Sequence, residues 1–213
     1  MNRREFALGV GSGSLASLLA GPAHAQGEPV EGREYKRVQN PQPVSTPAGK
    51  VEVVEFFGYW CPHCNAFEPT LDSWARKLPP DVVLRRIPVA FNEPQKPYQK
   101  LFYALEAMGQ LDAMHRKVFT AIHTQHMRLE KDSELQSLAT ANGLDPAKLL
   151  DTMKSFSVAT KCNQARQAAE AWRIDSVPTM GVQGRFITSV ADAGGPTEAT
   201  RVMDALIQKV RKG

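Results

Sequence analysis

Two cysteines separated by two residues carry the clearest chemistry in this sequence. Cys61 and Cys64 enclose Pro62 and His63, a spacing at which two sulfurs can form a disulfide or stand as a dithiol. If Cys61 begins a helix, unpaired backbone N–H groups and the positive end of the helix dipole stabilise its thiolate. Pro62 suits the first helical position, and a cationic His63 would add positive charge near the sulfur.

A stabilised thiolate makes such a pair an oxidant. A sulfur with a low pKa is a good leaving group, so a disulfide that contains it is readily given away. Cys64, one helical turn further on, is the expected resolving thiol. The spacing therefore predicts a redox-active disulfide, Cys61–Cys64, that works without a separate cofactor.

Zinc binding and an inert disulfide are the alternative interpretations of this spacing. A zinc site needs a second pair of ligands, but only Cys162 remains among the 3 cysteines. His115, His123 and His126 are scattered along one segment, so we predict no metal site. An inert bridge would close a loop too short to constrain much of the unfolded chain.

The elements that must position the pair follow from the pattern of apolar residues. Residues 51–57 are a β-branched and aromatic run, which fits a strand buried on both faces. Apolar residues at helical spacing predict a helix over 65–78, and Pro69 should kink it. A second strand is expected over 82–89.

The rest of the chain divides into a helical block and a short β-β-α end. Nearly every residue from 95 to 173 fits helix, and Asp145-Pro146 is a typical helix start. A strand pair is predicted over 179–183 and 185–188, followed by a final helix from Pro196 or Thr197. The order of elements is β-α-β, helical block, β-β-α.

The segment FFGYWCPHC, Phe56 to Cys64, resembles the active-site segment of DsbA-type periplasmic thiol:disulfide oxidoreductases. Pro62-His63 is typical of that branch, and Pro69 matches the helix-kinking proline of the wider thioredoxin superfamily. The resemblance implies an α/β fold, a thioredoxin-like fold with an inserted all-helical domain. The expected parts are a signal peptide at 1–25, a lead-in segment at 26–50, a thioredoxin-like domain at 51–94 and 174–213, and the helical insertion at 95–173.

The N-terminus has the composition of an export signal. Arg3 and Arg4 are its positive region, residues 6–20 are apolar, and Ala23-His24-Ala25 precedes the expected cleavage site. The adjacent arginines followed by Phe6 also resemble a twin-arginine signal, and a general secretory signal is the alternative. Either route predicts a periplasmic protein.

The resemblance adds a late proline to the site. Val177-Pro178-Thr179 stands just before a predicted strand, where thioredoxin-fold proteins place a cis proline that faces the dithiol. The resemblance implies a backbone edge, at Val177 and Thr179, on which an extended substrate peptide can pair. A trans proline that starts a strand is the alternative from the sequence alone.

Two carboxylates also match positions of the family. Beneath the dithiol, Glu55 would be desolvated, with a raised pKa, and could exchange a proton with Cys64. Its alternative role is a pair with Arg85 or Arg86 on the next strand. We expect Glu68 to be solvated.

Three further side chains invite a functional interpretation. Tyr59 and Trp60 precede the first cysteine in a loop, so we predict that they form an apolar rim for unfolded substrate, with core packing as the alternative. Cys162 lies on an apolar helical stripe and is expected to be a buried small side chain, with a third exchangeable thiol as the alternative.

Composition limits the possible partners. The chain is 42% hydrophobic, which is enough for a core, and its net charge of +4 includes no Lys/Arg run, so we predict no nucleic-acid binding. A monomer is expected, since the sequence shows no coiled-coil or dimerisation segment. The resemblance implies reduced or unfolded exported proteins as substrates, oxidised by the disulfide, and a DsbB-type quinone-linked oxidase as partner. A disulfide isomerase or reductase, or a redox-inactive periplasmic binding module, is the alternative.

Overall fold

The computed structural model describes residues 27–213, so the predicted export signal and its cleavage site lie outside the described residues. A five-stranded mixed sheet forms the centre, with strand order β1-β5-β4-β2-β3. The strands are β1 (Lys36–Arg37), β2 (Val51–Phe57), β3 (Val82–Pro88), β4 (Thr179–Val182) and β5 (Phe186–Ser189).

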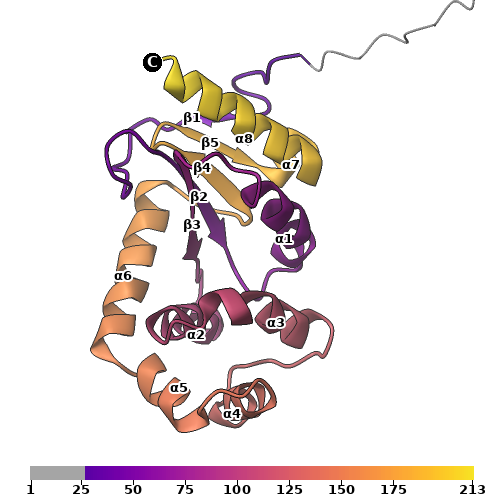
Figure 1. Cartoon of the computed structure of the whole chain (residues 1–213), viewed down its shortest axis with the longest axis vertical. Coiled ribbons are helices and arrows are strands. Elements are labelled where there is room, and N and C mark those ends of the chain that lie inside the picture. Colours follow the sequence, from indigo (N-terminus) through magenta and orange to yellow (C-terminus); the bar gives the residue numbers. More distant parts are fainter. Residues whose placement is uncertain (1–26) are drawn as a thin grey trace, which may run out of the picture.

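The helices fall into two groups (Figure 1). Helices α1, α7 and α8 lie with the sheet, α2 to α5 form the opposite end of the molecule, and α6 leads back from α5 to the sheet. Their bounds are α1 (Pro62–Ala75), α2 (Lys96–Ala107), α3 (Leu111–His123), α4 (Asp132–Ala141), α5 (Pro146–Met153), α6 (Phe156–Ala171), α7 (Val190–Ala193) and α8 (Pro196–Arg211).

Strand β2 is buried on both faces, as predicted, because a different hydrophobic cluster covers each face. Val54 and Phe56 belong to a cluster that includes the helices of the insertion, whereas Val53 belongs to one built with α1 and α8. β2 runs parallel to β3 and antiparallel to β4. The strand that leads to Cys61 is therefore packed on both faces by hydrophobic clusters and paired along both edges with neighbouring strands.

One predicted helix is shifted along the chain, and one short helix was not predicted. Helix α1 spans Pro62–Ala75 rather than 65–78; it begins early because Cys61 takes the N-cap position and the proline fits the first helical turn. Helix α7 was not predicted, since four residues are too few to show a helical period. Asp145 caps α5 as expected, and its carboxylate accepts a hydrogen bond from the N–H of Lys148.

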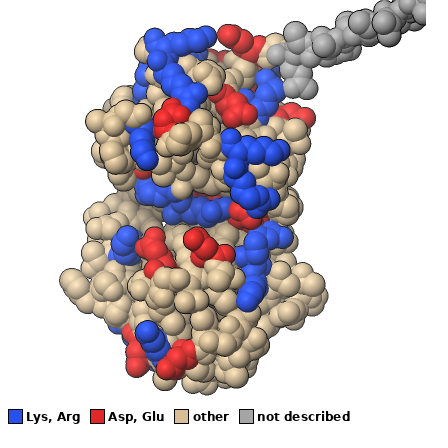
Figure 2. Space-filling model, in the orientation of Figure 1, with Lys and Arg blue, Asp and Glu red and all other residues tan. Residues whose placement is uncertain are grey.

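The five helices α2 to α6 occupy the stretch predicted as the insertion, and the exact division into domains stays a prediction. On the face shown in Figure 2, acidic and basic side chains are intermixed, apart from a basic band at the waist between the two halves. Among residues 27–213, no helix is both long and apolar enough to cross a membrane.

Candidate functional site

The two cysteines lie where β2 gives way to α1. Cys61 has extended backbone angles at the N-cap, and Cys64 is one turn into the helix. Both are free thiols, with 4% and 0% of their surface exposed. The strand thus fixes the position of the pair, and the helix directs its N-terminal N–H groups toward the first sulfur.

The surroundings separate the acidities of the two thiols. A hydrogen bond from the Cys64 thiol is the largest cause that lowers the pKa of Cys61 to about 6; burial opposes it, and the N–H groups of Cys64 and His63 and the charge of His63 support it. Burial, the bond to Cys61 and the nearby charge of Glu55 raise the pKa of Cys64 far above its usual value. Cys61 is therefore the thiolate and leaving group of the pair.

This separation predicts how the reduced protein titrates. The thiolate absorbance should appear with a midpoint near pH 6 as the pH rises, because Cys61 ionises first. In a Cys64→Ala variant, which lacks the donated hydrogen bond, the midpoint should move upward. A wild-type midpoint near the ordinary cysteine value of about 8.5 would contradict the assignment.

The Val177–Pro178 peptide bond is cis, in agreement with the expectation from the resemblance. The Cys61 thiol donates to the Val177 carbonyl over 3.4 Å, so the proline loop faces the first sulfur. The Thr179 hydroxyl donates to the Ser176 carbonyl over 2.8 Å and braces the loop. The structure therefore brings together two segments that are 116 residues apart.

Glu55 shows both predicted environments at once. Its side chain is fully buried near Cys64, and it accepts a hydrogen bond from Arg86 Nε over 3.1 Å. Burial and the charge of Glu68 raise the pKa of Glu55 to about 8, although Arg86 opposes the shift. A carboxyl group beside the second sulfur thus holds its proton at neutral pH.

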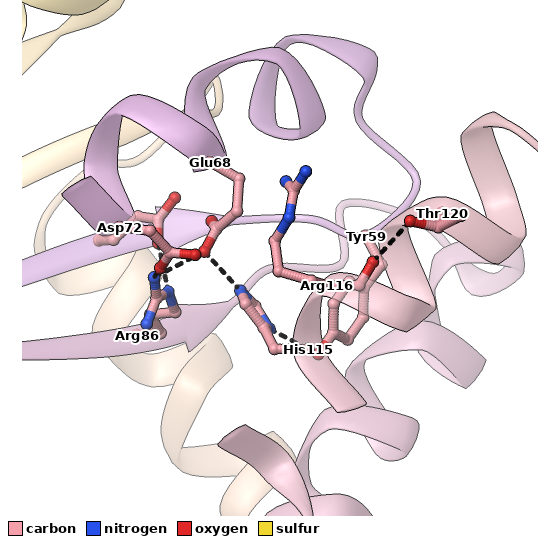
Figure 3. Close-up of polar contacts among 8 residues, drawn as sticks. Tyr59, Glu68, Asp72, Arg86, His115, Arg116 and Thr120 are labelled. Carbon is pink, nitrogen blue, oxygen red and sulfur yellow. Dashed lines mark hydrogen bonds and ion pairs between the residues drawn. The ribbon is translucent and has the colours of Figure 1, made fainter. Parts of the chain in front are cut away.

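The prediction that Glu68 is solvated is wrong. Its side chain is 0% exposed, because β3 and α3 cover it with Arg86, whose Nη2 donates over 2.7 Å, and His115, whose Nε2 lies 3.2 Å from Oε1 (Figure 3). Burial favours a raised pKa, but His115 and Arg86 outweigh it and the pKa of Glu68 is lowered. Two adjacent buried carboxyl groups thus differ in charge.

The predicted rim is half wrong, since Tyr59 is a core residue. It is 1% exposed and packs edge-on against Phe57 and Phe119. The alternative, core packing, therefore holds for Tyr59, because α3 of the insertion covers the loop. The sequence could not show this contact, which spans more than 50 residues.

Trp60 is partly exposed and donates its indole N–H to the Val89 carbonyl over 3.1 Å. Its ring packs edge-on against Phe91, which is 45% exposed. Gly58 leaves room for the indole, since a Cβ there would collide with it. The apolar surface next to Cys61 is therefore made by Trp60 and Phe91, and the sequence interpretation missed the second of these.

The remaining candidates lie outside the reactive pair. Cys162 is half-buried in α6 rather than fully buried, and burial raises the pKa of its thiol to about 11. Between residues 27 and 213, no three His, Cys, Asp or Glu side chains come close enough to hold a metal. His123 Nε2 lies 2.8 Å from the Tyr59 carbonyl, which gives this histidine a structural contact.

Comparison with known proteins agrees with this geometry. The DSBA-like thioredoxin domain family matches residues 52–194. The chain is 44% identical over 200 residues to the thiol:disulfide interchange protein DsbA of Bordetella parapertussis, with 93% of each chain covered. It is 40% identical over 198 residues to DsbA of Pseudomonas aeruginosa PAO1, again with 93% of each chain covered.

Solved structures show the same arrangement. The crystal structure of Pseudomonas aeruginosa DsbA has a TM-score of 0.82 at 40% identity, with 86% of this chain and 95% of that chain covered. DsbA from Xylella fastidiosa has a TM-score of 0.81 at 28% identity, with 87% and 99% covered. The fold is thus the thioredoxin-like α/β fold with inserted helices, and the chain belongs to the DSBA-like thioredoxin family of thiol:disulfide oxidoreductases.

Proposed function

We propose that this protein is a periplasmic dithiol oxidase, which donates the Cys61–Cys64 disulfide to newly exported proteins. The observation that carries the proposal is the unequal acidity of the two thiols, with a pKa of about 6 for Cys61 and a strongly raised pKa for Cys64. A low pKa on the outer sulfur favours the reduced protein, so its disulfide is readily transferred. The disulfide itself is the only redox group that the reaction needs.

The first step forms a mixed disulfide. A substrate thiolate attacks Cys61 Sγ, a new S–S bond forms there, and the Cys61–Cys64 bond breaks. The electron pair of that bond goes to Cys64, whose high pKa demands a proton. Glu55, protonated at neutral pH and close to Cys64, is the proposed donor.

The second step releases the product. A second substrate thiolate attacks the substrate sulfur of the mixed disulfide, and Cys61 leaves as a stabilised thiolate. The substrate has then lost two electrons and carries a disulfide, while the protein holds the two electrons as its dithiol. Of the two protons that the substrate thiols release, one restores the proton of Glu55 and the other passes to solvent, because Cys61 remains a thiolate.

Reduced or unfolded exported proteins are the proposed substrates. The backbone at Val177, whose carbonyl faces Cys61, is the proposed contact for an extended peptide, which would bind without strong sequence preference. Thr179 lies in β4 between β2 and β5, so its backbone offers no sheet edge, and its proposed contribution is to brace the loop through its hydroxyl. Trp60 and Phe91 add an apolar contact of the kind that unfolded chains present. These features favour broad substrate selection.

Reoxidation requires a partner, since each turnover leaves a dithiol. We propose a DsbB-type quinone-linked oxidase of the inner membrane, in line with the family. Export by the twin-arginine or the general secretory route would deliver the protein to the compartment where both substrate and partner occur.

The test is the redox equilibrium of residues 26–213 in glutathione buffers, with free thiols trapped and counted. We expect a potential far above that of thioredoxin, which is about −270 mV. A value near that of thioredoxin would instead favour a reductase or isomerase. The absence of any reversible two-thiol change would favour a redox-inactive binding module.

Glu55→Gln tests the proton donor. Wild-type oxidation should slow as the pH rises through about 8, because the raised pKa of Glu55 means that its proton is present below that value and lost above it. The variant should lack this dependence and be slower at neutral pH by up to about 10²-fold. An unchanged pH profile would exclude the proton role.

A further inference from the structure

His115 is a buried imidazole that bridges the insertion and the reactive pair (Figure 3). It extends from α3, and only 5% of its surface is exposed. Nδ1 lies 2.7 Å from the Tyr59 hydroxyl, in the loop that leads to Cys61. Nε2 lies 3.2 Å from Glu68 Oε1, on α1. One ring therefore touches both segments that flank the cysteines.

Aromatic side chains enclose the imidazole. Phe57, Phe102 and Phe119 each meet its ring edge-on, at centroid distances of 5.3, 6.2 and 5.3 Å. A phenylalanine at this position would preserve such packing, so apolar burial does not explain a histidine here. The polar contacts of the two ring nitrogens explain it.

The hydrogen-bond partners define the roles of the two nitrogens. When the Tyr59 hydroxyl donates to Nδ1, the hydrogen lies on Nε2 and faces the carboxylate of Glu68. This N–H is at ion-pair distance but is not aligned with the carboxylate as a full hydrogen bond. This contact lowers the pKa of Glu68 and therefore favours its ionised form.

The charge of Glu68 reaches the second sulfur through Glu55. Glu68 is a cause of the raised pKa of Glu55, and the charge of Glu55 in turn raises the pKa of Cys64. Arg86 on β3 donates to Glu55, Glu68 and Asp72. These groups form a continuous charged cluster from His115 to the cysteines.

The outer side of the cluster meets a surface pocket of about 400 Å³. Besides His115, Arg86 and Asp72, the charged side chains that line it are Arg76, the residue that follows α1, and Asp112 and Arg116 on α3. The basic and acidic side chains that line this pocket nearly balance in charge. Glu68 is therefore the charged group that distinguishes the surroundings of the His115 ring.

We propose that His115 is a positioning residue of the exchange reaction, which acts on the reactive pair through Glu68, while the Tyr59 hydroxyl contacts the other nitrogen of its ring. This inference rests on the proposed dithiol oxidase function. It means that the helical insertion adjusts the pH range over which the cysteines work.

The test compares His115→Phe with Tyr59→Phe, using the pH profile of dithiol-peptide oxidation. Without His115, the pKa of Glu68 should rise, less negative charge should face Glu55, and the alkaline fall in rate should move to lower pH by roughly one unit. Tyr59→Phe keeps the Glu68 contact, so its alkaline fall should stay at the wild-type pH. His115→Gln, whose amide N–H can face Glu68, should restore most of the profile.

A folded His115→Phe variant with the wild-type profile would overturn the inference. If that variant does not fold, Glu68→Gln must reproduce the shift, and failure to do so overturns the inference equally. A wild-type protein that does not oxidise the peptide at any pH would instead overturn the proposed function, so the two failures are distinguishable.

Discussion

A Cys61→Ser variant should lose all catalysed oxidation of a dithiol peptide. The hydroxyl cannot form a disulfide with Cys64, and no other thiol lies at the N-terminus of α1. We expect the rate to fall to that of the uncatalysed reaction, measured by trapping free peptide thiols over time. If the protein were instead a redox-inactive binder of unfolded chains, the Cys61→Ser variant would keep its full activity. The variant therefore separates redox chemistry from a binding role.

Two matched variants sharpen this result. Cys64→Ser cannot form the Cys61–Cys64 disulfide, so it should also lose catalysed oxidation of the dithiol peptide. Offered a peptide that already contains a disulfide, its Cys61 thiolate should attack that bond and release one peptide thiolate, and the mixed disulfide should persist because the buried thiol that would resolve it is missing. Cys162→Ser changes a half-buried cysteine in α6 with a raised pKa, and should oxidise the peptide at the wild-type rate. Full activity in Cys61→Ser, or none in Cys162→Ser, would contradict the assignment of the reactive pair.

Replacement of Arg86 by methionine should destabilise the protein by about 3–5 kcal/mol. The guanidinium is the shared cation of Glu55, Glu68 and Asp72, at 3.1, 2.7 and 2.9 Å. Its loss leaves buried carboxyl groups without positive charge, which costs much more than the loss of an exposed pair. Denaturant unfolding of the reduced proteins measures the difference.

The pH dependence and a control distinguish this effect from lost packing. Without Arg86 the carboxyl groups bind protons more readily in the folded protein. The loss of unfolding free energy relative to the wild type should therefore shrink as the pH falls and these groups become neutral. Arg166→Met removes an exposed pair with Glu170 in α6 and should cost less than about 0.5 kcal/mol. A deficit for Arg86→Met that matches this control, or that does not vary with pH, would exclude the buried cluster as the cause.

The linear order of elements was predictable because each long segment has a clear period. The buried run of β2, the helical spacing of the insertion and the proline at the start of α1 are local features. The reactive pair was equally visible, since its spacing alone restricts the chemistry. Even the partner strand of Glu55 was anticipated, as parallel neighbours bring Glu55 opposite Arg86.

The errors concern side chains whose burial depends on distant segments. Nothing near Glu68 or Tyr59 in the sequence indicates that α3 will cover them, because His115 follows about 50 residues later. Phe91 lies in a connecting segment without a period, so its contact with Trp60 was not visible either. Long-range docking of the insertion, which no local pattern encodes, decides the electrostatics around the cysteines.

The division of β2 between two hydrophobic clusters has a consequence for folding cooperativity. Neither cluster can open without exposing one face of this strand, so the insertion and the sheet should unfold in one transition rather than in two. The amide hydrogens of β2 should then exchange with solvent only through global unfolding, and rank among the slowest in the molecule. The loop to Cys61 is attached to the end of that strand, so its attachment point should be released only when the whole protein unfolds.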